Sequence, residues 1–133
     1  MSDTYKPILA ITMGDAAGSG PEIITKTLAD ERIRKECRPL VIGDASTMED
    51  ALRITGMPGQ VRTISEVSQA EYADNTIEVL DLKNIDLSKL QRGHVDVMAG
   101  QAAYDYIKLA TELSLGNTVD GMVTSATNKE SLN

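Results

Sequence analysis

The stretch of the sequence that decides the fold is Ile8-Leu9-Ala10-Ile11-Thr12-Met13-Gly14-Asp15-Ala16-Ala17-Gly18-Ser19-Gly20-Pro21-Glu22. Its first half, residues 7–13, is an apolar run with β-branched residues, which predicts a buried strand. Gly14 ends that run, and Pro21 stands where the first turn of a helix tolerates a residue without an N–H group. The stretch therefore predicts a strand, a glycine-rich loop and a helix in succession.

The same succession of strand and helix continues along the chain. Apolar spacing predicts further strands over 39–43, 60–64, 76–80 and 119–124, and helices over 21–35, 44–56 and 95–115. The polar residues 66–75 are expected to form a turn or a short helix. Such alternation favours an α/β fold of three layers, α/β/α, with a mostly parallel sheet. We expect residues 1–133 to form a single α/β domain, as part of a larger two-domain enzyme.

Composition excludes several classes of protein. The 133 residues carry a net charge of -7, which argues against a nucleic-acid-binding module. No apolar run approaches the ~20 residues that a membrane span needs. Cys37 is the only cysteine, so an internal disulfide is excluded and a cytoplasmic setting is expected. His94 is the only histidine and has no obvious partner ligands, so the residues themselves predict no metal site. A small phosphorylated substrate remains compatible with this charge.

The glycine loop admits two interpretations. Gly14, Gly18 and Gly20 permit positive φ and close backbone approach, and free N–H groups at a helix start favour an anion. Their spacing matches neither the dinucleotide fingerprint nor the P-loop. A tight turn and an anion-binding loop therefore stay equally open. Asp15 either braces the loop or faces a ligand, and Asp44 is expected to cap a helix rather than bind a ribose.

A second candidate loop follows the strand predicted over 119–124. It contains Asn128 and Lys129, and a lysine there can hold a phosphate or a carboxylate, or simply be solvated. Parallel sheets bind ligands at the carboxyl ends of their strands, and both candidate loops follow such ends. The candidate residues for binding a substrate or its phosphate are Asp15, Gly18, Gly20, Asn128 and Lys129.

Four motifs of the chain resemble the 4-hydroxythreonine-4-phosphate dehydrogenase family. They are residues 11–22, 39–45 (Pro-Leu-Val-Ile-Gly-Asp-Ala), 99–104 (Ala-Gly-Gln-Ala-Ala-Tyr) and 128–132 (Asn-Lys-Glu-Ser-Leu). The asparagine-lysine pair is more similar to the branch acting on D-threonate or D-erythronate 4-phosphate than to the branch of pyridoxine biosynthesis. The resemblance spans essentially the whole chain, which corresponds to the N-terminal part of a typical member.

The resemblance implies an activity that composition and spacing do not show. Family members have the fold of isocitrate and isopropylmalate dehydrogenases, with two α/β/α domains around a cleft. They are homodimers that oxidise and decarboxylate a phosphorylated hydroxy acid, such as 4-hydroxythreonine 4-phosphate or threonate 4-phosphate. The reaction uses NAD and a divalent metal held by histidines.

The resemblance also limits what these residues can do. The residues that map onto the cleft-lining opening loop are Gly14, Asp15, Gly18, Gly20 and Glu22, and those that map onto the asparagine-lysine turn are Asn128 and Lys129. The family's substrate histidine and metal histidines would follow Asn133. We therefore expect no catalytic residue and no metal ligand here, no proper binding of NAD or metal, and no activity of the chain alone.

Two departures from the family pattern place the shape of both loops in question. Ala16 replaces the usual proline after the aspartate, and residues 125–127 replace a segment that contains proline. Each change removes a φ constraint. The alternative to an enzyme is a non-catalytic binding or interaction module of the same fold, and in either case an open sheet edge would favour self-association.

Overall fold

A computed structural model describes residues 5–125 of the protein. Within that range the strands form one sheet in the order β3-β4-β2-β1-β5, and every neighbouring pair is parallel. The strands are β1 Ile8–Thr12, β2 Arg38–Gly43, β3 Gln60–Ile64, β4 Thr76–Asp81 and β5 Gly121–Thr124. The predicted parallel sheet is confirmed, and its strands lie within two residues of the ranges expected from the apolar runs.

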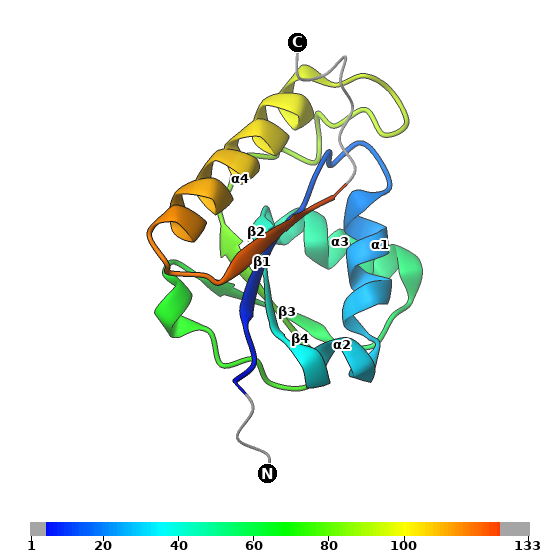
Figure 1. Ribbon diagram of the computed structural model, residues 1–133. Coiled ribbons are helices and arrows are strands. Elements are labelled where there is room, and N and C mark those ends of the chain that lie inside the picture. Colours follow the sequence, from blue (N-terminus) through cyan, green and yellow to red (C-terminus); the bar gives the residue numbers. More distant parts are fainter. Residues whose placement is uncertain (1–4, 126–133) are drawn as a thin grey trace.

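Helices cover both faces of this sheet. They are α1 Gly20–Leu28, α2 Glu31–Glu36, α3 Ala45–Thr55 and α4 Val97–Leu115, with a short 3₁₀ helix η1 at Val67–Gln69. Figure 1 shows α4 on one face and α1 beside α3 on the other. The three-layer α/β/α prediction is therefore confirmed. In the described range no helix is both long and apolar enough to cross a membrane.

The single helix predicted over 21–35 is wrong, because the chain forms two helices there. Asp30 adopts an extended backbone (φ −81°, ψ 115°), and its side chain accepts a hydrogen bond from the N–H of Arg32. This cap begins α2 and turns it away from α1. Apolar periodicity missed the break because Asp30 lies on the polar side of the predicted helix. A polar residue there is consistent with one continuous helix, so the spacing of the apolar residues does not reveal that Asp30 caps a second one.

The helix predicted over 44–56 is confirmed together with both of its caps. Asp44 is the N-cap of α3, and its Oδ2 accepts hydrogen bonds from the Thr47 N–H (3.0 Å), the Thr47 hydroxyl and the Ser46 hydroxyl. Gly56 ends the helix with φ 67°, a left-handed conformation that glycine adopts without strain. Asp44 is therefore used as a cap, as expected.

The core is aliphatic, as the scarcity of aromatic residues suggests. Leu40, Val41 and Ile42 of the central strand β2 are completely buried between the two helical layers. Tyr106 of α4 is the aromatic exception: it is also fully buried, and its hydroxyl donates a hydrogen bond to Oδ1 of Asn84 at 2.7 Å. Burial raises the pKa of Tyr106 far above its usual value, so this hydroxyl stays protonated and keeps the bond.

The helix predicted over 95–115 begins two residues later, at Val97, because Asp96 is its N-cap. The Asp96 carboxylate accepts hydrogen bonds from the backbone N–H groups of Gln91 and Ala99, both at 3.0 Å. These bonds favour the charged form and lower the pKa of Asp96 below its usual value. The cap therefore joins the start of α4 to the connection that precedes it.

Replacing Asp96 by alanine is expected to lower the free energy of unfolding by about 1 kcal/mol at pH 7. A carboxyl group with a depressed pKa stabilises the fold above its unfolded pKa of about 3.9, and this contribution is lost as the pH falls through the folded pKa. Urea titrations at pH 7 and pH 3 should therefore show a smaller difference between variant and parent at pH 3. Glu112→Ala, on the exposed side of the same helix, is the control, and an Asp96→Ala effect that grows in acid would contradict the assignment.

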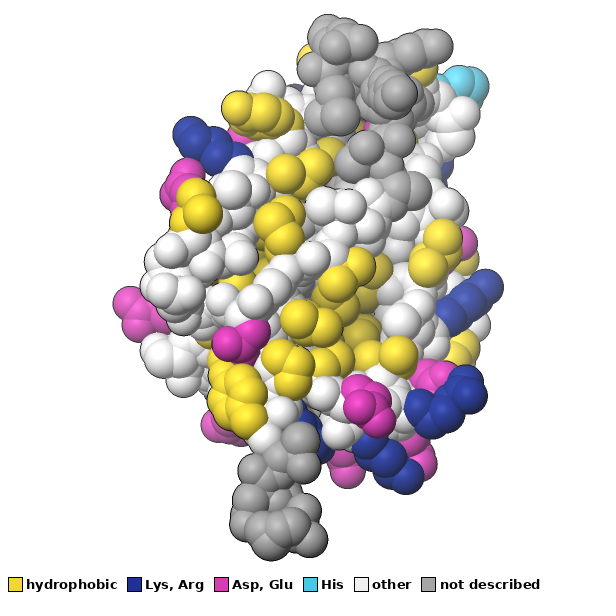
Figure 2. Space-filling view, in the orientation of Figure 1, with side chains coloured by type: hydrophobic (Ala, Val, Ile, Leu, Met, Phe, Trp, Pro, Cys, Tyr) yellow, Lys and Arg dark blue, Asp and Glu magenta, His cyan; other side chains and the backbone are white. Residues whose placement is uncertain are grey.

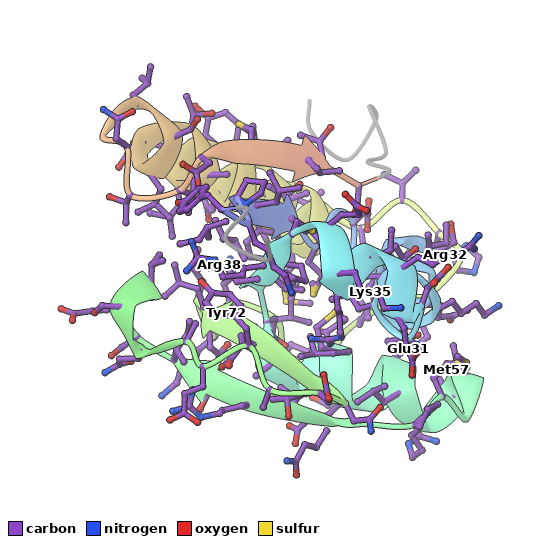
Figure 3. All side chains as sticks on the ribbon, turned by 60° about the horizontal axis from the view of Figure 1, so that its bottom comes forward. Glu31, Arg32, Lys35, Arg38, Met57 and Tyr72 are labelled. Atoms are coloured by element: carbon purple, nitrogen blue, oxygen red, sulfur yellow. The ribbon has the colours of Figure 1, made fainter. Side chains whose placement is uncertain are left out.

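The amino edge of the sheet is held by side chains that are already paired. The guanidinium of Arg38 lies over the rings of Tyr5 and Tyr72, at 5.0 and 5.7 Å from their centroids. Figure 3 labels Arg38 and Tyr72 at this edge. Arg34 donates to the carbonyl groups of Leu28 and Thr76 at 3.0 and 2.8 Å. A cavity that Arg34 also lines has both basic and acidic side chains around it: Lys6, Glu31, Arg34, Lys35 and Asp74. This edge therefore braces the fold.

Candidate functional site

The two candidate loops begin side by side at the carboxyl edge of the sheet. Strands β1 and β5 are direct neighbours, with Thr12 opposite Thr124. Beyond that pair, the Ser125 N–H donates a hydrogen bond to Oγ1 of the buried Thr12 at 3.3 Å. The prediction that both loops lie at strand carboxyl ends is confirmed, and the structure adds that the two strands are adjacent.

The glycine loop after β1 is folded tightly around Asp15. Oδ1 of Asp15 accepts a hydrogen bond from the Ala17 N–H at 2.8 Å, and its carbonyl oxygen accepts one from the Gly18 N–H at 3.0 Å. Gly14, just before Asp15, has φ 80°, which explains why a glycine stands there. One oxygen of Asp15 therefore braces the loop, as the first of the two interpretations expects.

The other oxygen of Asp15 has no hydrogen-bond partner among the residues that the structure describes. The residue is only 3% exposed, and Oδ2 is buried without a hydrogen bond. A buried polar atom left unpaired costs about 1–3 kcal/mol, and more when it is charged. Native structures rarely keep such an atom without a functional reason. Bracing of the loop thus explains the position of Oδ1 but not the burial of Oδ2.

Neighbouring aspartates at this edge are engaged by the backbone. Oδ1 of Asp81 accepts from the N–H groups of Ala45 and Lys83, both at 3.0 Å, and Asp44 and Asp96 cap helices as described. Within residues 5–125, Asp15 Oδ2 is the one carboxylate oxygen that is buried without a partner. This distinguishes Asp15 from the other acidic residues of the edge.

The connection before α4 also meets the glycine loop, which sequence reasoning missed. The Gly93 N–H donates to the Ala17 carbonyl at 2.8 Å, and Arg92 pairs with Asp50 on α3. His94, beside them, is exposed, as its polar surroundings suggest. Nothing in the local pattern of either segment signals this contact, because about 75 residues of chain separate its partners.

Gly18 and Gly20 occupy different environments in the loop. Gly18 is exposed, whereas Gly20 is buried as the first residue of α1. Ser19, the N-cap of α1, makes no side-chain hydrogen bond to the helix, so its hydroxyl is not committed to capping. The candidates Asn128 and Lys129 lie outside the described residues, so their expected role in phosphate binding stays a prediction.

An apolar groove runs beside α1 from the glycine loop along the open edge of β5. It measures about 280 Å³, and its lining residues are Ile11, Gly20, Ile23, Ile24, Thr27, Leu28, Val123, Thr124 and Ser125. Ile23 and Val123 are 53% and 47% exposed. Figure 2 shows hydrophobic side chains gathered over the middle of this face. Among residues 5–125 this groove is an exposed apolar surface that adjoins the candidate site.

The resemblance implies two cofactors, a divalent metal, which needs a cluster of ligands, and NAD, which often binds at a glycine fingerprint. Among residues 5–125, no three His, Cys, Asp or Glu side chains come close enough to hold a metal ion. The glycine spacing differs from the dinucleotide fingerprint, and Asp44 is engaged as a cap. No chemical step is therefore placed on a metal or on a nicotinamide in this part of the chain.

Comparison with known families identifies the kind of protein that carries this loop. The family model described as pyridoxal phosphate biosynthetic protein PdxA matches residues 35–133. The chain belongs to this family. The match covers three of the four motifs that carry the resemblance, and it excludes the glycine loop.

Relatives and solved structures agree with the PdxA assignment. The D-threonate 4-phosphate dehydrogenase of Cupriavidus necator is 43% identical over 132 residues, which are 99% of this chain and 39% of that protein. A 4-hydroxythreonine-4-phosphate dehydrogenase structure from Burkholderia phymatum is 44% identical with a TM-score of 0.94, over 97% of this chain and 39% of its own. One from Klebsiella pneumoniae is 36% identical with a TM-score of 0.88, over 96% and 39%.

These comparisons show two things about the chain. Its relatives are dehydrogenases, so the PdxA family is enzymatic. The chain spans about two-fifths of the length of the relatives it matches.

Proposed function

We propose that this chain forms the glycine-loop part of a cytoplasmic, homodimeric dehydrogenase that oxidises and decarboxylates a small phosphorylated hydroxy acid. D-threonate 4-phosphate and 4-hydroxythreonine 4-phosphate are the candidate substrates, since the relatives are named for them. The single observation that carries the proposal is the fold similarity of 0.94 in TM-score at 44% identity to the Burkholderia phymatum structure. The glycine loop and the end of β5 would supply one wall of the substrate site.

The parts of this wall would have separate roles. NAD, when bound, would accept the hydride, and a divalent metal would be held by residues outside 5–125. The start of α1 presents backbone N–H groups that favour an anionic ligand group. Lys129, with Asn128 beside it, would hold the phosphate next to that helix start. The bond between Ser125 N–H and Thr12 holds the residue after β5 beside the end of β1.

The alternative function is a non-catalytic binding or interaction module. The observation that favours it is the groove beside α1, where Ile23 and Val123 are about half exposed along the open edge of β5. Such an edge, with an apolar surface beside it, is suited to association with another chain. In the dehydrogenase proposal the same surface would be covered within the whole enzyme.

A chimera tests the dehydrogenase proposal. Residues 1–133 would replace the matching segment of the Cupriavidus necator enzyme, to which the chain is 43% identical. We expect the chimera to reduce NAD⁺ with D-threonate 4-phosphate within about tenfold of the natural enzyme, a loss of no more than about 1.4 kcal/mol in transition-state stabilisation. The 133-residue chain assayed alone, with added divalent metal, is expected to show no turnover.

Two outcomes would contradict the proposal. A chimera that melts cooperatively and has the dimeric mass of the natural enzyme, yet turns over neither candidate substrate, would favour the interaction module. Turnover by the isolated chain would show that the chemistry does not need the remaining length of the relatives. The natural enzyme, purified in parallel, is the control for both assays.

A further inference from the structure

We propose that Oδ2 of Asp15 accepts a hydrogen bond from a hydroxyl group of the bound ligand, so that Asp15 selects a hydroxyl and not the phosphate. The inference rests on the proposed function, whose ligands carry hydroxyl groups on the substrate and on the ribose of the nucleotide. One of the two interpretations of the sequence is that the loop binds a phosphate through hydrogen-bond donors. Asp15 would instead act as an acceptor for a hydroxyl.

The first observation is the unequal use of the two carboxylate oxygens. Oδ1 is engaged by the Ala17 N–H at 2.8 Å, whereas Oδ2 is buried and has no partner. Asp86 forms the same turn, with Oδ1 accepting from the N–H two residues on at 3.0 Å, but it lies on the exposed surface. The turn itself therefore does not require burial. Within residues 5–125, Oδ2 of Asp15 is therefore a buried acceptor to which no donor is assigned.

The second observation is the chemistry of that acceptor. An ionised carboxylate only accepts hydrogen bonds, so its partner must carry a donor hydrogen. A phosphate at this oxygen would place two negative groups in contact, which is costly in a poorly solvated site. A hydroxyl supplies the donor without the repulsion. In this proposal the phosphate therefore binds away from Asp15, where the first N–H groups of α1 would attract it.

The third observation is the route to Asp15 over Gly18. Gly18 is exposed, and a Cβ added to it would stand 3.9 Å from the Asp15 Cβ and 3.5 Å from the Asp15 carbonyl oxygen. These are ordinary contact distances, so the loop would tolerate a methyl group there. In this proposal a ligand atom approaches Asp15 over the exposed glycine, and the loop must move to expose Oδ2, which is buried in the structure.

Titration of the ¹⁵N-labelled chimera described above, in which residues 1–133 stand within a whole enzyme, tests the inference through the amide signals of Ala17 and Gly18. Two probes carry carbon-bound hydroxyls: D-threonate 4-phosphate carries those of the substrate, and NAD⁺ carries those of the ribose. The third probe, inorganic phosphate, has no carbon-bound hydroxyl. We expect saturable shifts with one of the first two probes, and that probe identifies the source of the hydroxyl. Inorganic phosphate should leave both signals in place and should not compete.

Two variants separate the proposed role from a structural one. Asp15→Asn keeps an oxygen for the Ala17 N–H but loses the second acceptor, so binding should weaken at least about tenfold. The variant should stay folded without ligand, because it retains the oxygen that accepts the hydrogen bond from the Ala17 N–H. Gly18→Ala should block the approach and weaken binding similarly while the chain stays folded. Asp86→Asn is the matched control and should bind as the parent does.

Several results would overturn the inference. The first is that the Ala17 and Gly18 signals of the parent respond to neither hydroxyl probe. The second is that Asp15→Asn binds as tightly as the parent. The third is that Asp15→Asn strengthens the binding of phosphate. If Asp15→Asn fails to fold, Asp15 is structural and Gly18→Ala decides whether a ligand passes over the loop. An active chimera together with unaltered binding by Asp15→Asn would leave the dehydrogenase proposal standing and remove only the role of Asp15.

Discussion

Replacing Glu78 by alanine is expected to lower the free energy of unfolding by about 3 kcal/mol, measured by urea denaturation. Glu78 lies in β4 and is 1% exposed. Its Oε1 accepts from Nη1 of Arg62 at 2.9 Å, and its Oε2 accepts from the backbone N–H groups of Glu71 and Tyr72, both at 2.8 Å. The variant would leave the arginine and two backbone donors without their acceptor, and would release the loop between β3 and β4.

Glu71→Ala is the matched control for Glu78→Ala. Glu71 contacts the same Arg62 at 3.6 Å, but its side chain is 71% exposed. A solvent-exposed pair of this kind contributes only about 0–1 kcal/mol. If the two variants proved equally stable, the buried carboxylate would not be what holds the loop. Arg62 itself is 39% exposed, so water can replace part of what it loses.

Replacing Gly43 by alanine is expected to destabilise the protein by about 3 kcal/mol, the upper end of the range for overpacked cores. A Cβ at Gly43 would stand 2.6 Å from the Cβ of Met13 and 3.0 Å from its Sδ. The close approach brings the carboxyl ends of β1 and β2 together, where the Met13 N–H donates to the Ile42 carbonyl at 2.9 Å. The glycine loop begins at this point, so the substitution would also displace it.

The double variant with Met13→Ala should not recover this stability. Alanine retains the Cβ atom that makes the shortest contact, and that atom is fixed to the backbone. Gly18→Ala is the control, since its nearest contact is 3.5 Å and it should melt within a few degrees of the parent. A Gly43→Ala variant whose free energy of unfolding stays within about 0.5 kcal/mol of the parent would contradict the prediction.

Predictions from sequence succeeded where the signal is local. The run from Ile8 to Met13, the cap at Asp44 and the glycine at position 56 each depend on a few neighbouring residues, and the structure confirms all three elements. The same reasoning failed at Asp30, where a polar residue inside a helical pattern caps a new helix. Apolar periodicity predicted a single helix there, and the side-chain hydrogen bond of Asp30 marks the start of a second one.

The candidate site shows the same division more sharply. Sequence reasoning selected Asp15, Gly18 and Gly20 and left their role open between a tight turn and a ligand loop. The structure shows that one oxygen of Asp15 serves the turn and the other is free of partners. Burial of an individual atom cannot be inferred from residue type, because it depends on what the rest of the chain packs around it.

The sequence by itself determined the strand–loop–helix units, the parallel α/β class and the family, because these follow from local propensity, apolar spacing and motifs. Only the tertiary structure decided the strand order that places β5 beside β1, the contact of Gly93 with Ala17, and the bonds from Arg62 and the loop amides to Glu78. Those features join residues that are far apart in the chain. Their free energy arises from packing and burial across the whole domain, which no short stretch of sequence encodes.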